Sequence, residues 1–208
     1  MTYSKKLQAA EIHLATNDPR LAQLIKKYGP CRLKPHKDYY KELLESIVGQ
    51  QLSMKTADAI WQRVLLFFGE VVPTPRQIAD ADTESLRACG LSYGKVKYMK
   101  DLATHILDGR LDLAHVTILP NDELIRELTA VKGIGQWSAH MFMIFGLGRL
   151  DILPVGDLGI KKASMNIYNL RNLPSPERLI KLSKQNVWPP YESIAAWYLW
   201  RSLDNKPA

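Results

Sequence analysis

Apolar side chains recur at intervals of three and four residues along most of the chain, which is the spacing of one face of an α-helix. No alternating apolar and polar pattern persists over the length of a strand, and the chain has no internal repeat or low-complexity tract. The pattern predicts helices over residues 18–29, 37–51, 53–69, 92–109, 121–131, 136–147, 157–170, 175–185 and 190–203, and two short ones within 74–90. We therefore predict an all-α protein with short loops between neighbouring helices.

Residues with strong positional preferences mark the ends of several of these helices. Asp18 is suited to an N-cap, Pro19 to the first helical position and Gly29 to a stop. Ser53 precedes one predicted helix, and the pair Ser175-Pro176 precedes another. These residues predict where the helices begin and end.

The composition adds a core and a basic charge to this picture. Of the 208 residues, 46% are hydrophobic, which is enough for a buried core in one compact domain or two small lobes. Lys and Arg exceed Asp and Glu by 28 to 21, a formal charge of +7 that suits a polyanionic partner. The five Trp and nine Tyr residues supply aromatic faces that stack on bases.

The sequence lacks the residue patterns that several kinds of metal site and enzyme need. The two cysteines, Cys31 and Cys89, are far apart, which disfavours a disulfide framework, a zinc site and a cysteine-ligated iron–sulfur cluster. The five histidines have no metallohydrolase spacing, and no nucleotide-binding loop or serine-hydrolase elbow occurs. No segment is apolar over the thickness of a bilayer. We expect no membrane association and an intracellular protein, cytoplasmic or, in a eukaryote, nuclear.

The segment 128–160 combines a glycine turn, an aromatic residue and a carboxylate. Gly133-Ile134-Gly135 lies between two amphipathic helices, where glycine permits a positive φ and leaves backbone amides uncovered. Amides at the start of a helix bind phosphate, and Ile134 is expected to pack inward. An ordinary corner between two helices is the alternative interpretation. A dinucleotide-binding turn is disfavoured, because no strand precedes it and Ser138 replaces the third glycine.

Asp157 and Trp137 each allow two interpretations. Asp157 is suited to the N-cap of helix 157–170, but a carboxylate held there can also face a cleft. Trp137 follows the glycine turn directly and is either a core aromatic or a ring placed close to DNA.

The combination of these motifs resembles a known family. The stretches "LTAVKGIGQWSA" and "DILPVGDLGIKKA" resemble the helix-hairpin-helix and the Gly/Pro-rich loop with its aspartate in the HhH-GPD DNA glycosylases. Within that superfamily the chain is most similar to the alkylbase (3-methyladenine) DNA glycosylase II group, the AlkA type. The similarity extends over "SIVGQQLSMKTADAIWQRV", "LRACGLSYGKVKYMKDLA" and "WPPYESIAAWYLWR", and thus from about Tyr39 to Arg201.

The resemblance implies a two-lobed helical bundle with a helix-hairpin-helix motif. One lobe is expected to span residues 38–150 and to carry the hairpin. The second, discontinuous lobe is expected to combine residues 1–37 with 151–208, with the active-site cleft between the two lobes. We expect the chain to lack the N-terminal sheet domain that accompanies this fold in the best-known enzyme of the type.

The resemblance also assigns roles to individual positions. Asp157 corresponds to the catalytic aspartate, and the Gly133–Gly135 hairpin presents amides to a DNA phosphate. A structural Na⁺ or K⁺ is expected at the main-chain carbonyls of Thr129, Val131 and Ile134, and no other cofactor is required. Gln51, assisted by Leu52, corresponds to a wedge that enters the DNA stack; a polar residue at a helix end is the alternative.

The residue after "GIGQ" indicates the type of reaction. Members that also cut the DNA strand carry a lysine there as Schiff-base nucleophile, whereas this chain has Trp137, which implies a monofunctional enzyme without lyase activity. Met141 stands where the best-known enzyme has a pocket tyrosine, and Glu192 where the family usually has arginine. The base pocket is expected to be lined by Trp137, Met141, Trp197, Trp200 and Trp61.

The predicted function is excision of alkylated purines, of the 3-methyladenine and 7-methylguanine type, from duplex DNA by base flipping and hydrolysis in base excision repair. We expect a monomer that binds double-stranded DNA containing damaged bases. Alternatives are a glycosylase for deaminated or oxidised bases and a non-catalytic helix-hairpin-helix DNA-binding protein. Four lysines are candidates for contacts with the DNA backbone, or otherwise lie on solvated helix faces: Lys95, Lys97, Lys132 and Lys161.

Overall fold

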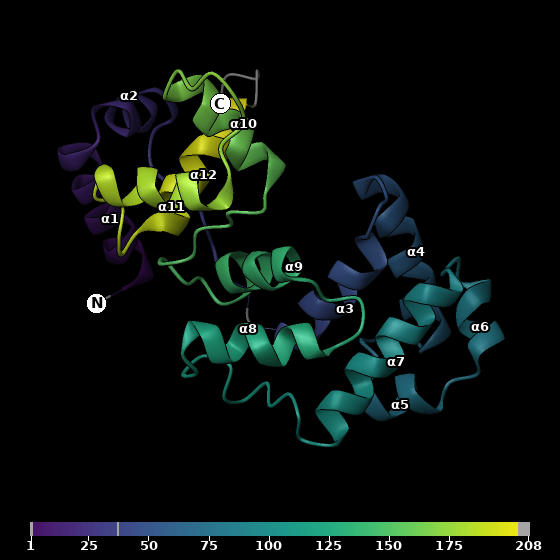
Figure 1. Cartoon of the computed structure of the whole chain (residues 1–208). Coiled ribbons are helices and arrows are strands. Elements are labelled where there is room, and N and C mark those ends of the chain that lie inside the picture. The colour runs from purple at the N-terminus through teal and green to yellow at the C-terminus, as the bar shows by residue number, and fades with distance from the viewer. Residues whose placement is uncertain (1, 37, 204–208) are drawn as a thin grey trace. The chain divides into compact units, whose positions relative to one another are not determined.

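The computed structural model describes residues 2–36 and 38–203, and within these ranges it contains helices and no strand (Figure 1). The all-α prediction is therefore confirmed. Residues 1, 37 and 204–208, which include the first residue of the predicted helix 37–51, lie outside the described part. Within the described residues, no helix is both long and apolar enough to cross a membrane.

The chain divides into two compact units. Unit 2 is continuous and runs from His36 to Phe142, whereas unit 1 combines the chain up to Pro35 with the part from Met143 onward. The lobes predicted from the sequence place residues 143–150 with the central part of the chain, and their boundaries stay a prediction.

Within the described residues, the core of unit 1 surrounds α12. The helices α2, α1 and α10 each pack against α12, and Tyr198 and Leu199 of α12 are fully buried. The bounds of the helices are α1 (Tyr3–Asn17), α2 (Pro19–Tyr28), α10 (Leu158–Ile167), α11 (Pro176–Gln185) and α12 (Glu192–Leu203).

A fully buried carboxylate joins the beginning of unit 1 to its end. Asp18 caps α2, and its Oδ1 accepts the backbone N–H groups of Arg20 at 2.9 Å and Leu21 at 3.2 Å. Its Oδ2 accepts the hydroxyl of Tyr168 and, at 2.8 Å, the indole N–H of Trp188. This network satisfies the hydrogen-bonding requirement of a charge that would otherwise be costly to bury.

Unit 2 is organised around α7, against which α5, α6 and α3 pack, while α8 packs against α9 (Figure 1). Met99 and Leu102 of α7 and Leu44 and Ile47 of α3 are fully buried. The helices are α3 (Tyr39–Gly49), α4 (Met54–Phe67), α5 (Pro75–Asp80), α6 (Thr83–Ala88), α7 (Tyr93–Leu107), α8 (Asn121–Ala130) and α9 (Gln136–Met141). A π-helical segment, η1 (Phe142–Gly146), follows α9 directly.

The three helix starts predicted from capping residues are confirmed, whereas the last helix, predicted from residue 190, begins at Glu192. Asp18, Ser53 and Ser175 are N-caps whose side chains accept backbone N–H groups, and Pro19 and Pro176 occupy the first helical turn. The first helix, α1, lies outside the segments for which the apolar pattern predicted a helix. Its buried face consists of only Leu7, Ala10 and Leu14, and the apolar pattern is interrupted by Ile12, which is 62% exposed.

Candidate functional site

A carboxylate stands at the N-terminus of α10 in unit 1. Asp157 is the N-cap of this helix, and its Oδ1 accepts the N–H of Ile160 at 2.7 Å. The same oxygen accepts the indole N–H of Trp200 at 2.9 Å. The half-buried carboxylate is thus oriented by two donors and by the positive end of the helix. The predicted capping role is confirmed, whereas a catalytic role stays a prediction.

The approach of Trp200 to Asp157 depends on a glycine that the sequence analysis did not identify. A Cβ atom at Gly159 would lie 3.0 Å from Asp157 Oδ1 and 3.2 Å from Cδ1 of Trp200, closer than side chains ordinarily pack. The indole also contacts Phe145, with ring centroids 5.7 Å apart and an angle of 33° between the planes. Of the predicted pocket residues, Trp200 therefore lies directly against the carboxylate. The sequence "GDLG" contains this glycine two positions after the aspartate, and that spacing is the feature from which its role could have been predicted.

The loop before Asp157 is fixed to the start of α12. The hydroxyl of Ser193 accepts the N–H of Ile152 at 3.0 Å and donates to the carbonyl of the same residue at 3.2 Å. The backbone N–H of Ser193 also donates to the carbonyl of Leu150 at 2.9 Å. The neighbouring Glu192 is half-buried, and burial together with the nearby Asp151 raises the pKa of its carboxyl. The N-terminus of α12 thus positions the chain that leads to Asp157.

Trp197 has a different environment from Trp200. It lies edge-on to the ring of Tyr198, at 4.9 Å between centroids, and the guanidinium of Arg201 lies 5.7 Å from its ring. Its ring is half-buried. These contacts place Trp197 in the packing of α12, and its predicted part in the base pocket is untested.

The hairpin between α8 and α9 in unit 2 is a type II β-turn. The N–H of Ile134 donates to the carbonyl of Val131 at 3.1 Å, and Gly133 at the third position has φ +85°. A Cβ at Gly133 would lie 2.3 Å from Cδ2 of Tyr98, so both the dihedral angle and the packing require glycine. Ile134 is 3% exposed, and its predicted inward packing is confirmed.

Gly135 differs from Gly133 in both respects. It is the N-cap of α9 with φ −90° and ψ 173°, a conformation open to any residue. A Cβ at this position would have no neighbour within 4 Å. The fold therefore gives no reason for glycine here, while a bare backbone at a helix start allows close approach of a ligand.

The remaining predicted pocket residues of unit 2 differ in exposure. Trp137, in the first turn of α9, is 53% exposed, whereas Trp61 on α4 is 5% exposed and belongs to the core. Met141, the last residue of α9, is half-buried. Of these three side chains, Trp137 presents the largest share of its surface to a partner.

Two of the four candidate lysines are engaged within unit 2. The ammonium of Lys95 donates to the carbonyl of Val48 at 2.7 Å, and burial lowers the pKa of this lysine. The ammonium of Lys132 lies 3.1 Å from Oδ1 of Asp101. Lys161 on α10 is half-buried. Their predicted contacts with DNA stay predictions.

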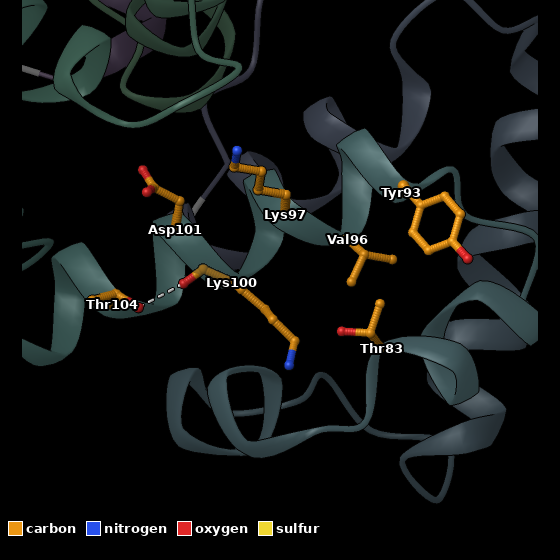
Figure 2. A pocket seen from close by; sticks show the side chains of 7 residues that line it. All are labelled: Thr83, Tyr93, Val96, Lys97, Lys100, Asp101 and Thr104. Carbon is orange, nitrogen blue, oxygen red and sulfur yellow. Dashed lines mark hydrogen bonds between the residues drawn. The ribbon is translucent and has the colours of Figure 1, made fainter.

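Lys97 is exposed and borders a hollow of about 490 Å³ on α7 (Figure 2). Figure 2 shows Lys97 and Asp101 on one side of the helix and Lys100 reaching away from them. The ammonium of Lys100 donates to the carbonyls of Ala79 and Ala81 at the end of α5. The hollow is lined by Thr83, Tyr93, Val96, Lys97, Lys100, Asp101 and Thr104.

The carbonyls predicted to hold a monovalent cation belong to the end of α8 and the turn that follows. The carbonyl of Val131 accepts the N–H of Ile134 inside the turn, and Thr129 belongs to the last turn of α8, where carbonyls have no partner within the helix. Oxygen atoms of this kind suit Na⁺ or K⁺. Among the described residues, no group of three or more His, Cys, Asp or Glu side chains is placed to hold a metal ion.

The turn between α3 and α4 carries the predicted wedge. Gln51 is exposed and has φ +57°, and Leu52 is 37% exposed. The residues that hold this turn and the hairpin are Gln50, which bonds to the carbonyl of Gly133, and Tyr98 and Asp101, which contact Gly133 and Lys132. Their contacts join positions far apart in the chain, and the local sequence carries no signal for such pairs.

A family model places the fold among proteins of DNA repair. The model of the HhH-GPD superfamily base excision DNA repair protein matches residues 44–190, more than half of the chain. The chain therefore belongs to the HhH-GPD superfamily, in agreement with the resemblance of its hairpin and aspartate motifs.

Individual relatives narrow this assignment. DNA-3-methyladenine glycosylase 1 of Schizosaccharomyces pombe is 37% identical over 94% of this chain and 87% of its own length. The crystal structure of a DNA-3-methyladenine glycosidase from Bacillus halodurans is 38% identical, with a TM-score of 0.86 over 94% of this chain and 89% of its own. The 3-methyladenine DNA glycosylase Mag1 of Schizosaccharomyces pombe, in complex with abasic DNA, is 35% identical, with a TM-score of 0.81 over 96% and 98%.

Proposed function

We propose that this protein is a DNA glycosylase that removes alkylated bases from DNA by hydrolysis of the N-glycosidic bond, as a step of base excision repair. The observation that carries this proposal is the carboxylate of Asp157, oriented through one oxygen by Ile160 and Trp200 within the sequence motif of the family's catalytic aspartate. Relatives named for 3-methyladenine excision align with nearly the whole chain, which supports the same class of substrate.

The carboxylate suits the electrostatics of this reaction. Cleavage of the glycosidic bond passes through a sugar with oxocarbenium character, and a preoriented negative charge stabilises that cation. Asp157 also orients or deprotonates the attacking water. A second acid is less necessary for alkylated purines, because such a base is already cationic and leaves readily.

The finer proposal for the substrate is an alkylated purine of the 3-methyladenine or 7-methylguanine type. A cationic base is attracted to the face of an electron-rich ring by about 0.5–2 kcal/mol. The exposed indole of Trp137 suits this contact, while Trp200 lies against the carboxylate. Trp137 also stands in place of the lysine that a lyase would need, which supports hydrolysis without strand cleavage.

The proposed partner is duplex DNA that contains a damaged base, bound by a monomer. The hairpin of unit 2 is proposed to hold a phosphate through backbone amides, and a Na⁺ or K⁺ at the carbonyls of Thr129, Val131 and Ile134 would lend it positive charge. The expected location is the cytoplasm or, in a eukaryote, the nucleus.

The products released from methylated DNA test the proposed function. Wild-type protein is expected to release free 3-methyladenine and 7-methylguanine from methylated duplex DNA and to leave the strand intact until alkali is added, because no Schiff base forms. Chromatography of the released bases and a denaturing gel record both results. Release of hypoxanthine or 8-oxoguanine in preference to methylpurines would instead indicate the alternative function, a glycosylase for deaminated or oxidised bases. Binding without any release would select a non-catalytic DNA-binding protein.

The proposed binding of a DNA phosphate by the backbone amides of the Gly133–Gly135 hairpin is called the phosphate grip below. The two hairpin glycines supply a matched pair of variants that test it. Gly135→Ala is expected to keep the thermal stability of the protein, since the added methyl group meets open space, but to weaken binding to undamaged and abasic duplexes about 10-fold by holding the phosphate away from the amides. Gly133→Ala is expected to lower thermal stability, because its methyl group overlaps the ring of Tyr98. Calorimetry and DNA titration measure the two effects. Unchanged DNA affinity in Gly135→Ala would contradict the grip.

A further inference from the structure

The turn that presents Gln51 is a strained one. Residues Gly49–Leu52 form a second type II β-turn, closed by a hydrogen bond of 3.1 Å from the N–H of Leu52 to the carbonyl of Gly49. Gln50 has φ −52° and ψ 128°, and Gln51 occupies the third position with φ +57°, where glycine is favoured. An exposed glutamine in this conformation costs about 1–2 kcal/mol relative to ordinary backbone. Its surroundings must therefore hold the turn.

Gln50 connects this turn to the hairpin. Its side-chain amide donates a hydrogen bond of 2.7 Å to the carbonyl of Gly133, 83 residues further along the chain. The end of α3 is also bonded to α7, through Lys95 and the carbonyl of Val48. The residue that precedes the proposed wedge is thus attached to the glycine at the centre of the proposed phosphate grip.

The hairpin itself is fixed to α7 and provides a firm attachment. The carboxylate of Asp101 accepts the backbone N–H of Lys132 at 2.8 Å and also pairs with the ammonium of that residue. Burial alone would raise the pKa of Asp101, but its contacts with Lys132 hold this pKa below its usual range. Tyr98, one turn earlier on α7, packs against the backbone of Gly133. The backbone of Lys132 and Gly133, which carries the carbonyl that Gln50 binds, is therefore held against α7.

We propose that Gln50 is a positioning residue that ties the wedge turn to the hairpin, so that Gln51 and the phosphate grip engage DNA as one surface of unit 2. The inference rests on the proposed function, because it takes DNA with a vacated base position as the ligand. On undamaged DNA only the grip is used, so the tether contributes little. On DNA with an abasic site the wedge fills the gap, and the tether determines whether Gln51 is held in place to do so.

Gln50→Met tests the tether, since it removes the amide donor and keeps the length of the side chain. At fixed salt concentration, its affinity for a duplex with an abasic-site analogue is expected to fall about 5- to 10-fold, the value of one partly buried hydrogen bond. Its affinity for the undamaged duplex is expected to change by less than about 2-fold. Gln50→Asn, one methylene too short to reach Gly133, is expected to behave alike. Gln62→Met on the exposed face of α4 is the matched control and should match wild type.

A double-mutant cycle distinguishes a tether from general loosening of the fold. Gln51→Gly removes the wedge and relieves the strained φ, so this variant is expected to fold well. It should weaken abasic-site binding several-fold in the wild-type background and have almost no further effect in the Gln50→Met background. Equal effects in the two backgrounds, or equal weakening of both duplexes by Gln50→Met, would overturn the inference. Base release by wild type, assayed separately, decides the proposed function whatever the outcome of the cycle.

Discussion

Asp157→Asn is expected to lower the rate of base release from methylated duplex DNA by at least about 100-fold and to leave the fold intact. Asparagine is as good an N-cap as aspartate, and its carbonyl oxygen can still accept the N–H groups of Ile160 and Trp200. The substitution therefore removes the negative charge and little else. Single-turnover release of methylpurines measures the rate, and thermal unfolding checks the fold.

The matched control for this variant is Asp151→Asn. Asp151 lies in the same loop, six positions earlier, and its side chain is exposed. Its loss is expected to leave base release close to that of wild type. If Asp157→Asn released bases as fast as Asp151→Asn, Asp157 would be a helix cap without a catalytic role.

Asp18→Ala is expected to destabilise the protein by at least about 3 kcal/mol. The substitution leaves the Tyr168 hydroxyl and the Trp188 indole N–H buried without their acceptor, at about 1–3 kcal/mol each, and it also removes the cap of α2. A fall in the midpoint of urea unfolding, with a loss of near-ultraviolet signal from Trp188, measures the effect.

Asp38→Ala is the control for capping alone. Asp38 caps α3 through the N–H of Lys41 at 3.0 Å, but its side chain is exposed. This variant is expected to lose only about 1 kcal/mol. Similar losses in the two variants would mean that the buried network around Asp18 adds nothing beyond an ordinary cap.

The helix boundaries, the position of Asp157 and the hairpin turn could be predicted because each depends on residues that are neighbours in the sequence. The helix starts at Asp18, Ser53 and Ser175 follow from residue type and spacing, and so does the capping position of Asp157. The hairpin turn was predicted from its glycines, although only Gly133 adopts a positive φ. Such features are encoded within a few residues, and a single sequence is enough to find them.

Features that depend on tertiary packing were not predictable in the same way. Trp61 and Trp137 are the same residue type on helices, yet one is buried in the core and the other half exposed. The bonds from Gln50 to Gly133 and from Asp101 to Lys132 span 83 and 31 residues. Helix α1 packs against α2 and α12 and buries only Leu7, Ala10 and Leu14, a short apolar face that its exposed Ile12 obscures in the sequence. Propensity and periodicity carry no information about these long-range partners.

Because unit 1 is formed by two separate stretches of the chain, the two units can complete their folding only one after the other during synthesis. Unit 2 is one uninterrupted stretch, so all of its partners have emerged once Phe142 has left the exit tunnel. The α1–α2 pair is made before unit 2, yet Asp18 receives two of its four donors only from Tyr168 and Trp188, which are made after it. Asp157 likewise waits for Trp200. The nascent chain therefore completes the hairpin proposed to hold a DNA phosphate before the carboxylate of Asp157 is oriented by Trp200.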